Sequence, residues 1–314
     1  SFDYYYKKTN DILVQTPYIA AMGEGGEPWV NGASMNNQGV EFTVSFKSDP
    51  SSEFQWAVSA NIGTYKTELT DLPSNVINKY AGDGVHDLIL GRSPNSAYGL
   101  VADGIFKTQE EVDAHADQPG KAVGRIRYKD LDGDGVINET YDRTWIGCYD
   151  PDFFGGLNFD FAYKGFDLNL FFEGMFGNDV NSDWKKESDI WLFTNPAWKN
   201  HATRMLGGWS PDNPNSDIPA ISNNTANQEQ RFSSWFIEDG SYIKLRNIEL
   251  GYTFPTKLIK KMHMSNLRLY AAAYNVFTLK KFWGDDKYTS FDPERPSYHY
   301  LTPFTFNFGI NVSF

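Results

Sequence analysis

The last eleven residues of the chain alternate strictly between large apolar and small polar side chains. The apolar positions are Phe304, Phe306, Phe308, Ile310, Val312 and Phe314. Side chains of a β-strand point alternately to its two faces, whereas the side chains of a helix repeat every 3.6 residues. The segment therefore predicts a strand with one apolar face and one polar face.

Seven other segments give similar predictions. The alternation is regular in 40–46, 157–163 and 166–172. Only Lys164-Gly165 separates the last two, which predicts a tight hairpin. Less regular strands are expected at about 1–12, 54–65, 241–254 and 267–278, and the alternation breaks around Lys244 and Arg246. The sequence thus predicts eight strands.

The connections between these strands alternate in length. The short connections are 47–53, 164–165 and 255–266, and the long ones are 13–38, 66–153, 176–240 and 279–303. A soluble sandwich gives little reason for every second loop to be long, whereas outer-membrane barrels have short periplasmic turns and long extracellular loops. The predicted fold is therefore all-β, an antiparallel transmembrane β-barrel with long extracellular loops.

The alternative is a soluble lipocalin-like barrel or sandwich, in which the apolar faces would cover a core. Aromatic residues at strand ends, such as Phe54, Trp56 and Phe304, favour the membrane, because aromatic girdles lie at the bilayer interface. The apolar faces of 157–163, 166–172 and 304–314 are then expected to point to lipid. Their polar faces would line a water-filled or plugged lumen.

Composition removes other classes of protein. The chain has 28 Lys and Arg against 40 Asp and Glu, a net charge of −12, and no basic cluster, which argues against a nucleic-acid partner. No stretch approaches the roughly 20 apolar residues of a membrane-spanning helix. Cys148 is the only cysteine, so no internal disulfide can form. One short helix is expected where Thr108 and Glu111 form a capping box.

An Asp-rich segment in the connection 66–153 matches the first nine positions of a calcium-binding loop. Its candidate ligands are Asp130, Asp132, Asp134, Val136 through its carbonyl, Asn138 and Asp142. Calcium prefers six to eight oxygen ligands, and the twelfth position usually supplies a bidentate Glu. That position is Tyr141 here, so Glu139 or Asp142 would have to complete the shell. The alternative is an Asx-rich turn that binds no metal.

Aromatic residues cluster in the connection 176–240. Trp191, Trp198 and Trp209 are candidate ligand-binding residues, because indole rings stack on sugars and peptide side chains. The alternative is that these rings pack the loop into a small core of its own. No catalytic residue is predicted, since neighbouring carboxylates such as Glu238-Asp239 are typical of solvated loops. A glycoside hydrolase would need two carboxylates about 5–9.5 Å apart in a cleft.

Several motifs follow one another along nearly the whole chain. They occupy 37–42, 124–137, 142–147, 151–159, 163–168, 235–252 and 267–277, and the second includes Tyr-Lys-Asp-Leu-Asp-Gly-Asp-Gly. In this order they resemble SusC/RagA-type TonB-dependent transporters. The resemblance implies a barrel of about 22 strands with an N-terminal plug, a segment that TonB recognises and a SusD-like lipoprotein lid. Residues 1–314 would be the C-terminal part of that barrel, and the strand 304–314 would pair with the missing N-terminal part.

We therefore expect the chain to be part of an outer-membrane importer of a Gram-negative bacterium, and not an enzyme. Its substrates would be glycan fragments or oligopeptides, and TonB would act through the absent N-terminal part. The other expected partners are a SusD-like surface lipoprotein and outer-membrane lipid, and calcium is the one candidate cofactor. The alternative is a soluble or surface-anchored glycan-binding β-domain with a calcium turn, which would remain in aqueous solution without detergent.

Overall fold

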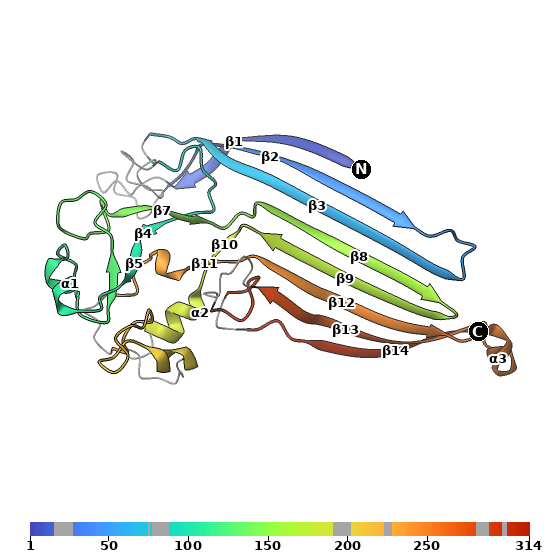
Figure 1. Ribbon diagram of the computed structural model, residues 1–314. Helices are drawn as coiled ribbons and strands as arrows, with labels where there is room; N and C mark the ends of the chain where they lie inside the picture. The colour runs from blue at the N-terminus through green and yellow to red at the C-terminus, as the bar shows by residue number, and fades with distance from the viewer. Residues whose placement is uncertain are drawn as a thin grey trace.

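The computed structural model describes residues 1–15, 28–74, 76, 88–190, 202–222, 228–280, 289–296 and 300–314. In this part of the chain the main feature is one eight-stranded antiparallel sheet with the order β1-β2-β3-β8-β9-β12-β13-β14 (Figure 1). Its strands are β1 (Phe2–Gln15), β2 (Trp29–Lys47), β3 (Phe54–Asp71), β8 (Phe153–Tyr163), β9 (Phe166–Phe176), β12 (Tyr242–Thr253), β13 (Asn266–Lys280) and β14 (Thr305–Ser313). The prediction of eight strands is confirmed.

The remaining elements belong to the connections. Three small two-stranded sheets pair β4 (Ser96–Leu100) with β7 (Arg143–Cys148), β5 (Ala102–Ile105) with β6 (Ile126–Tyr128), and β10 (Asp179–Asn181) with β11 (Ile237–Asp239). The α-helices are α1 (Gln109–Ala114), α2 (Asp183–Lys185) and α3 (Thr256–Ile259). Among the described residues, no helix is long and apolar enough to cross a membrane.

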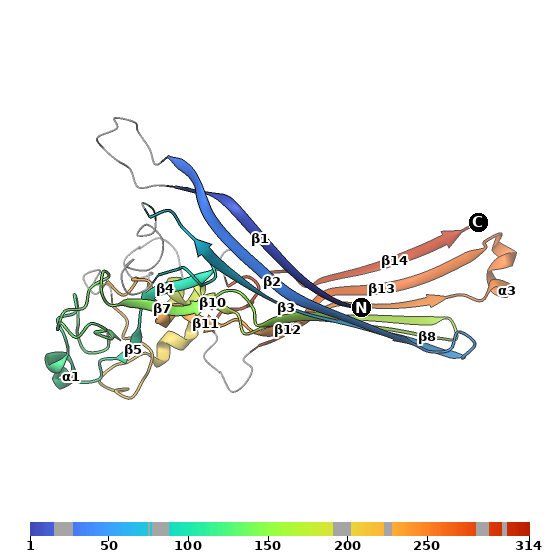
Figure 2. The ribbon, with the colours of Figure 1, turned by 90° about the horizontal axis from the view of Figure 1, so that it is seen from above.

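The two ends of the sheet differ as the connection lengths predict. The described parts of the connections after β3 and β9 gather at one end, and the short connections, including α3, lie at the other (Figure 1). Seen from above, the sheet is curved, and β1 and β14 both bend away from the middle strands toward the same side (Figure 2). The sheet thus forms a curved wall with an assembly of loops at one end. We call this assembly the loop body; it consists of the described parts of the connections between β3 and β8 and between β9 and β12.

The register of the strands joins their alternating residues into continuous rows. One apolar row runs through Phe46, Val58, Phe159, Leu170, Ile248, Ala273 and Phe306. The adjacent polar row contains Ser45, Ser59, Asn158, Phe171, Asn247, Tyr274 and Thr305. Segments 157–163, 166–172 and 304–314 therefore place their apolar residues on the same face, which we call the apolar face; the opposite one is the polar face.

Large side chains on the apolar face are exposed. Phe308 is 78% exposed and Phe2 is 67% exposed. On the polar face, glycines make room for large neighbours: the ring of Tyr270 covers Gly309, and the guanidinium of Arg268 covers Gly251. Among the described residues, no protein core therefore covers this side of the sheet.

The predicted hairpin and the predicted helix cap are both present, but the cap differs in one hydrogen bond. The hairpin at Lys164-Gly165 is confirmed, and both residues have positive φ (48° and 85°), as a type I′ turn requires. Helix α1 begins after Thr108, whose hydroxyl accepts the Glu111 amide at 3.3 Å. The reciprocal bond differs from a standard capping box, because the Glu111 carboxylate accepts the amide of Lys107.

The predicted bounds of the first strands are wrong. β1 extends to Gln15, β2 begins at Trp29 and β3 continues to Asp71, so part of the predicted connection 13–38 is strand. Backbone hydrogen bonds between these strands continue beyond the alternating segments. Near these ends, Val14, Ala33 and Leu69 form a small buried cluster with Leu72, Val76 and Ile89. The ends are thus held by a core of their own, and the alternating pattern does not extend to them.

Candidate functional site

The Asp-rich turn brings its first three aspartates together. Ligand atoms of Asp130, Asp132 and Asp134 lie within 4.8 Å of one another. The Asp130 carboxylate accepts the amides of Gly133 at 2.7 Å and Gly135 at 2.9 Å, and both glycines have positive φ. These bonds hold the three carboxylates on one side of a tight turn, where they fit a hard cation that prefers oxygen ligands.

The electrostatics of this turn also favour a cation. Although desolvation opposes it, hydrogen bonds from the Gly135 and Gly133 amides lower the pKa of Asp130 below its ordinary value. The amide of Asp134 acts to lower the pKa of Asp132, but desolvation and the charges of Asp134, Asp142 and Asp130 outweigh it and raise that pKa. Repulsion among carboxylates at this distance is relieved by a bound cation.

The other candidate ligands hold the backbone of the turn. The carboxylate of Asp142 is fully buried and accepts the amides of Leu131 at 2.8 Å and Asn138 at 2.7 Å. The side-chain oxygen Oδ1 of Asn138 accepts the amides of Thr140 at 2.9 Å and Tyr141 at 3.0 Å. The structure places these two residues in the frame of the turn, and a contribution from them or from Val136 to a metal stays a prediction.

The loop body has a buried core of its own, composed of Leu100, Ile105, Ile126, Tyr128, Ile137, Ile190 and Phe236. Trp209 and Trp235 pack against it. The position of Trp209 favours the packing alternative over a ligand-stacking role. Trp191 and Trp198 lie outside the described residues, so ligand binding by the three tryptophans stays a prediction.

A buried ion pair joins the two long connections within this core. Arg125 Nη1 donates to Glu229 Oε2 at 2.7 Å, and both side chains are at most 6% exposed. Glu229 Oε1 also accepts the Ile126 amide at 2.9 Å. Burial raises the pKa of Glu229 despite its attraction to Arg125. Arg125 belongs to the motif 124–137, so this motif builds the frame of the loop body.

The polar face of the sheet carries a group of charges that the sequence pattern did not identify. The alternation breaks at Lys244 and Arg246 because a β-bulge lies between Leu245 and Asn247. In the facing strand β13, Asn275 has a positive φ of 53°. The extra residue, Arg246, has an ion pair with Glu173, the cross-strand neighbour of Lys244. The break in the alternation at Lys244 and Arg246 was therefore the one feature of the sequence that indicated this group of charges.

A segment of the connection between β13 and β14, residues 289–296, lies against these charges and is here called the strap. Lys244 Nζ is 3.1 Å from Asp292 Oδ1 and 2.7 Å from Glu294 Oε2. Arg246 Nη2 is 2.5 Å from Glu294 Oε1. The strap thereby joins the loop end of the molecule to the polar face of β12.

Further along the same face, Arg268 is paired differently. Its guanidinium donates to Asp167 of β9 through Nε, at 3.0 Å, and through Nη2. Nη2 also donates to Glu249 of β12 at 2.7 Å. All three residues belong to strands of the sheet, so this ion cluster is a fixed part of the wall.

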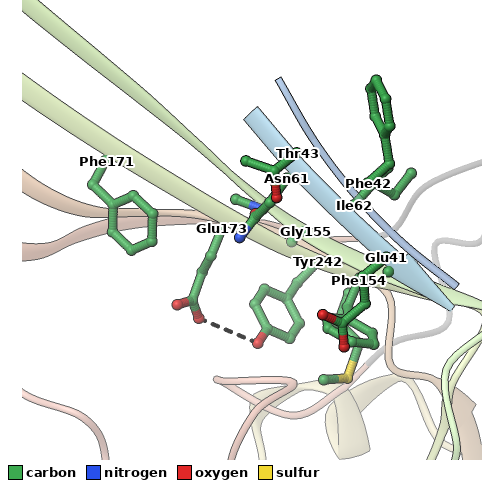
Figure 3. Close-up of a pocket in the computed structure, with 14 residues that line it drawn as sticks. Glu41, Phe42, Thr43, Asn61, Ile62, Phe154, Gly155, Phe171, Glu173 and Tyr242 are labelled. Carbon is green, nitrogen blue, oxygen red and sulfur yellow. Dashed lines mark hydrogen bonds between the residues drawn. The ribbon is translucent and has the colours of Figure 1, made fainter. Parts of the chain in front are cut away.

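A hollow of about 370 Å³ lies on the polar face between β2 and β12. Figure 3 shows Glu41, Phe154 and Tyr242 along it, with the Tyr242 hydroxyl donating to Glu173 at 3.4 Å. Asn61 also lines it. Its volume lies in the range of small-ligand pockets, and carboxylate, amide and aromatic groups suit polar ligands with an apolar side.

The neighbouring carboxylates of the sequence have structural partners. Glu238 accepts the hydroxyl of Thr289 at 2.8 Å, and Asp239 accepts the hydroxyl of Ser241. Glu111 caps α1, as described above. Asp285-Asp286 lies outside the described residues. The described pairs hold loops together, which is the ordinary role of such carboxylates.

Comparisons with known proteins give a consistent result. The chain is 30% identical over 332 residues to the TonB-dependent receptor P3 of Formosa agariphila, with all of the chain and 32% of the relative covered. It is 25% identical over 325 residues to the TonB-dependent receptor SusC of Bacteroides thetaiotaomicron, with 99% of the chain and 30% of the relative covered. No family model matches.

Solved structures show the same fold. The RagAB peptide transporter superposes with a TM-score of 0.75 at 23% identity, covering 100% of this chain and 33% of the other. The "open-open" state of the RagAB peptide importer gives a TM-score of 0.73, also at 23% identity, covering 100% of this chain and 32% of the other. The eight-stranded sheet is therefore a section of a large antiparallel β-barrel.

Fold and sequence relatives together define the class of the protein. The chain belongs to the TonB-dependent receptors of the SusC/RagA type and spans about a third of the length of the relatives it matches. The resemblance inferred from the motifs is confirmed. Its relatives are receptors and transporters and not enzymes.

Proposed function

We propose that the complete receptor imports oligomers, either glycan fragments or oligopeptides, across the outer membrane of a Gram-negative bacterium. The observation that carries this proposal is the similarity to SusC and to the TonB-dependent receptors of Formosa agariphila over the whole chain. Similarity to the RagAB peptide transporter in fold supports the same activity.

The two faces of the sheet agree with this proposal. The apolar face exposes large residues such as Phe306, at 53%, and Phe308, at 78%, which lipid would cover. The polar face carries the ion clusters of Arg268 and Lys244 and would face the lumen. A soluble glycan-binding domain would leave the same apolar face in water, at a large cost in free energy.

The expected partners follow from the relatives. A SusD-like lipoprotein would lie over the loop end of the barrel, and TonB would supply energy through parts of the receptor outside residues 1–314. Similarity to SusC and, in fold, to the RagAB peptide transporter supports the first of these partners. Substrate would pass between the loop body and the lipoprotein.

The test is made on the complete receptor in its own membrane. Deleting the gene should abolish uptake of the oligomer, and the tagged receptor should co-purify from detergent extracts with a surface lipoprotein. Recovery of the protein in aqueous extracts without detergent would support the soluble alternative and refute the proposal.

We also propose that the turn at Asp130, Asp132 and Asp134 binds calcium, and that calcium stiffens the loop body. The approach of the three carboxylates, held by glycine amides, is the observation in its favour. Titration of the EDTA-treated receptor with calcium, followed by calorimetry, should give one site that Asp132→Asn weakens. An unchanged heat of titration in this variant would exclude the turn as the site.

A further inference from the structure

Lys244 is a buried cation on the polar face. Only 1% of this residue is exposed, and the cross-strand carboxylate closest in register, Glu173, is engaged by Arg246. A buried charge is tolerated only when it is paired and hydrogen-bonded. The carboxylates that pair with Lys244 are Asp292 and Glu294 of the strap.

The contrast with Arg268 shows why this pairing is unusual. The carboxylates of Arg268 come from β9 and β12, two strands of the same sheet, so they cannot leave without disrupting the sheet. The carboxylates of Lys244 come from a loop segment that belongs to no strand of the sheet. Lys244 and Arg246 can therefore exchange these partners for other carboxylates while the wall stays intact.

The strap has further contacts that hold it between the wall and the loop body. The hydroxyls of Ser182 and Ser290 are 2.7 Å apart, and Trp184 packs edge-on against Phe291 with ring centroids 4.6 Å apart. Lys280 Nζ donates to the carbonyls of Ser290 and Phe291. Apart from the aromatic pair of Trp184 and Phe291, these contacts are single hydrogen bonds. A typical hydrogen bond contributes about 0.5–1.5 kcal/mol, and an aromatic pair contributes a similar amount beyond its buried area, so each contact can be broken and remade at a modest cost in free energy.

We propose that Lys244 and Arg246 form a carboxylate-binding site on the luminal wall, and that the strap occupies this site with Asp292 and Glu294 when substrate is absent. This inference rests on the proposed import function and names acidic oligomers as substrates. A carboxylate of such an oligomer, from a uronic acid or from a peptide, offers Lys244 and Arg246 the same charge-assisted hydrogen bonds as Glu294 does. Binding would displace the strap from the polar face of β12.

The first experiment locks the strap in the complete receptor, with Cys148 and any cysteine outside residues 1–314 replaced by serine. The pair Ser182→Cys and Ser290→Cys joins two positions whose hydroxyls are 2.7 Å apart. The matched control is Ser45→Cys with Ser59→Cys, two cross-strand residues of β2 and β3 whose hydroxyls are 2.9 Å apart, away from the strap. Each variant is measured oxidised and after reduction with dithiothreitol.

Four probes test whether a carboxylate is required and whether it comes from a saccharide or from a peptide. An oligogalacturonide is compared with a neutral oligosaccharide of equal length, and a Glu-containing peptide with its Gln counterpart. For one of the two acidic probes, we expect the oxidised lock to weaken binding at least tenfold and reduction to restore it, with no change in the control pair. Equal binding of the acidic and neutral probes in both arms, or an oxidised lock without effect, would overturn the proposal.

A second experiment tests the site without relying on import. Ser290 is 1% exposed, so a single Ser290→Cys in the same background should react slowly with a maleimide. Citrate should accelerate labelling severalfold over chloride at equal ionic strength, because it competes for Lys244 and Arg246. In combination with Asp292→Asn and Glu294→Gln, labelling should be fast with either anion.

The outcomes distinguish the two proposals. If the receptor neither binds nor imports any oligomer but citrate accelerates labelling, the import function is refuted and the carboxylate site stands. If import occurs and citrate has no effect beyond chloride, the site is refuted and the import function stands.

Discussion

The sheet and the loop body arrange their large apolar residues in opposite ways. On the sheet, Phe308 is 78% exposed and Phe46 is 63% exposed, whereas in the loop body Tyr128 and Leu100 are fully buried. The same hydrophobic effect produces both arrangements, because the sheet is built for lipid on one face and the loop body for water. Large apolar residues are therefore exposed on the sheet and buried in the loop body. Substitutions of similar residues should change stability for different reasons in the two regions.

The largest effect is expected in the loop core. Phe236→Ala removes a side chain that is 1% exposed and should destabilise the loop body by about 3–5 kcal/mol. Leu206, which is 90% exposed in the same region, provides the control, and Leu206→Ala should change stability by less than about 0.5 kcal/mol. Thermal unfolding followed by tryptophan fluorescence measures both. Similar losses in the two variants would contradict a conventional core.

A somewhat smaller effect is expected on the apolar face. Phe308→Arg near the middle of the membrane should destabilise the receptor by about 2–4 kcal/mol, whereas Asn307→Arg on the polar face should cost much less. The two positions are adjacent in β14 and lie on opposite faces of the sheet. Unfolding by guanidinium in lipid vesicles measures the change in the free energy of unfolding for both variants. Equal tolerance at the two positions would refute the assignment of the faces.

Calcium should affect only the loop body. At a calcium concentration about one hundred times the Kd, binding should stabilise it by about 2.7 kcal/mol, and EDTA should remove this contribution. Asp132→Asn should reduce the difference, while Asp217→Asn, whose side chain is 90% exposed, should leave it unchanged. Differential scanning calorimetry with and without EDTA measures it. A shift of the transition of the sheet instead would place the metal elsewhere.

The smallest effect concerns pH and the strap. Desolvation would raise the pKa of Glu294, but its hydrogen bonds to Arg246 and Lys244 outweigh this and lower it below the ordinary 4.5. Asp292 and Glu173 are the other carboxylates at this cluster. A carboxyl whose folded pKa is lowered stabilises the folded state above its unfolded pKa, and the stabilisation is lost as the pH falls through the folded value.

Hydrogen exchange of the strap amides tests this expectation. After correction for intrinsic rates, exchange in 289–296 should accelerate as the pH falls through and below 4.5, the ordinary value for Glu294. Glu294→Gln should remove this part of the pH dependence. Protection that stays constant to lower pH in the unmodified receptor would show that Glu294 does not hold the strap.

The sequence by itself determined the regular part of the molecule. Strict alternation at 304–314, 157–163 and 166–172 specified strands and their apolar faces, because a period of two allows no other regular structure. The connection lengths specified which end carries the loops. Motifs along the whole chain identified the family. In the Asp-rich turn, the spacing of Asp130, Asp132 and Asp134 was sufficient to predict that their carboxylates converge.

Only the tertiary structure decided how distant segments meet. Glu229 pairs with Arg125 across 104 residues of sequence, and Asp292 pairs with Lys244 across 48. No local pattern specifies such partners, because the sequence around a charged loop residue is similar whether that residue is solvated or buried against a side chain of opposite charge. The break in alternation at Lys244 and Arg246 was visible, but its meaning depended on a bulge and on a strap that only packing brings to the polar face.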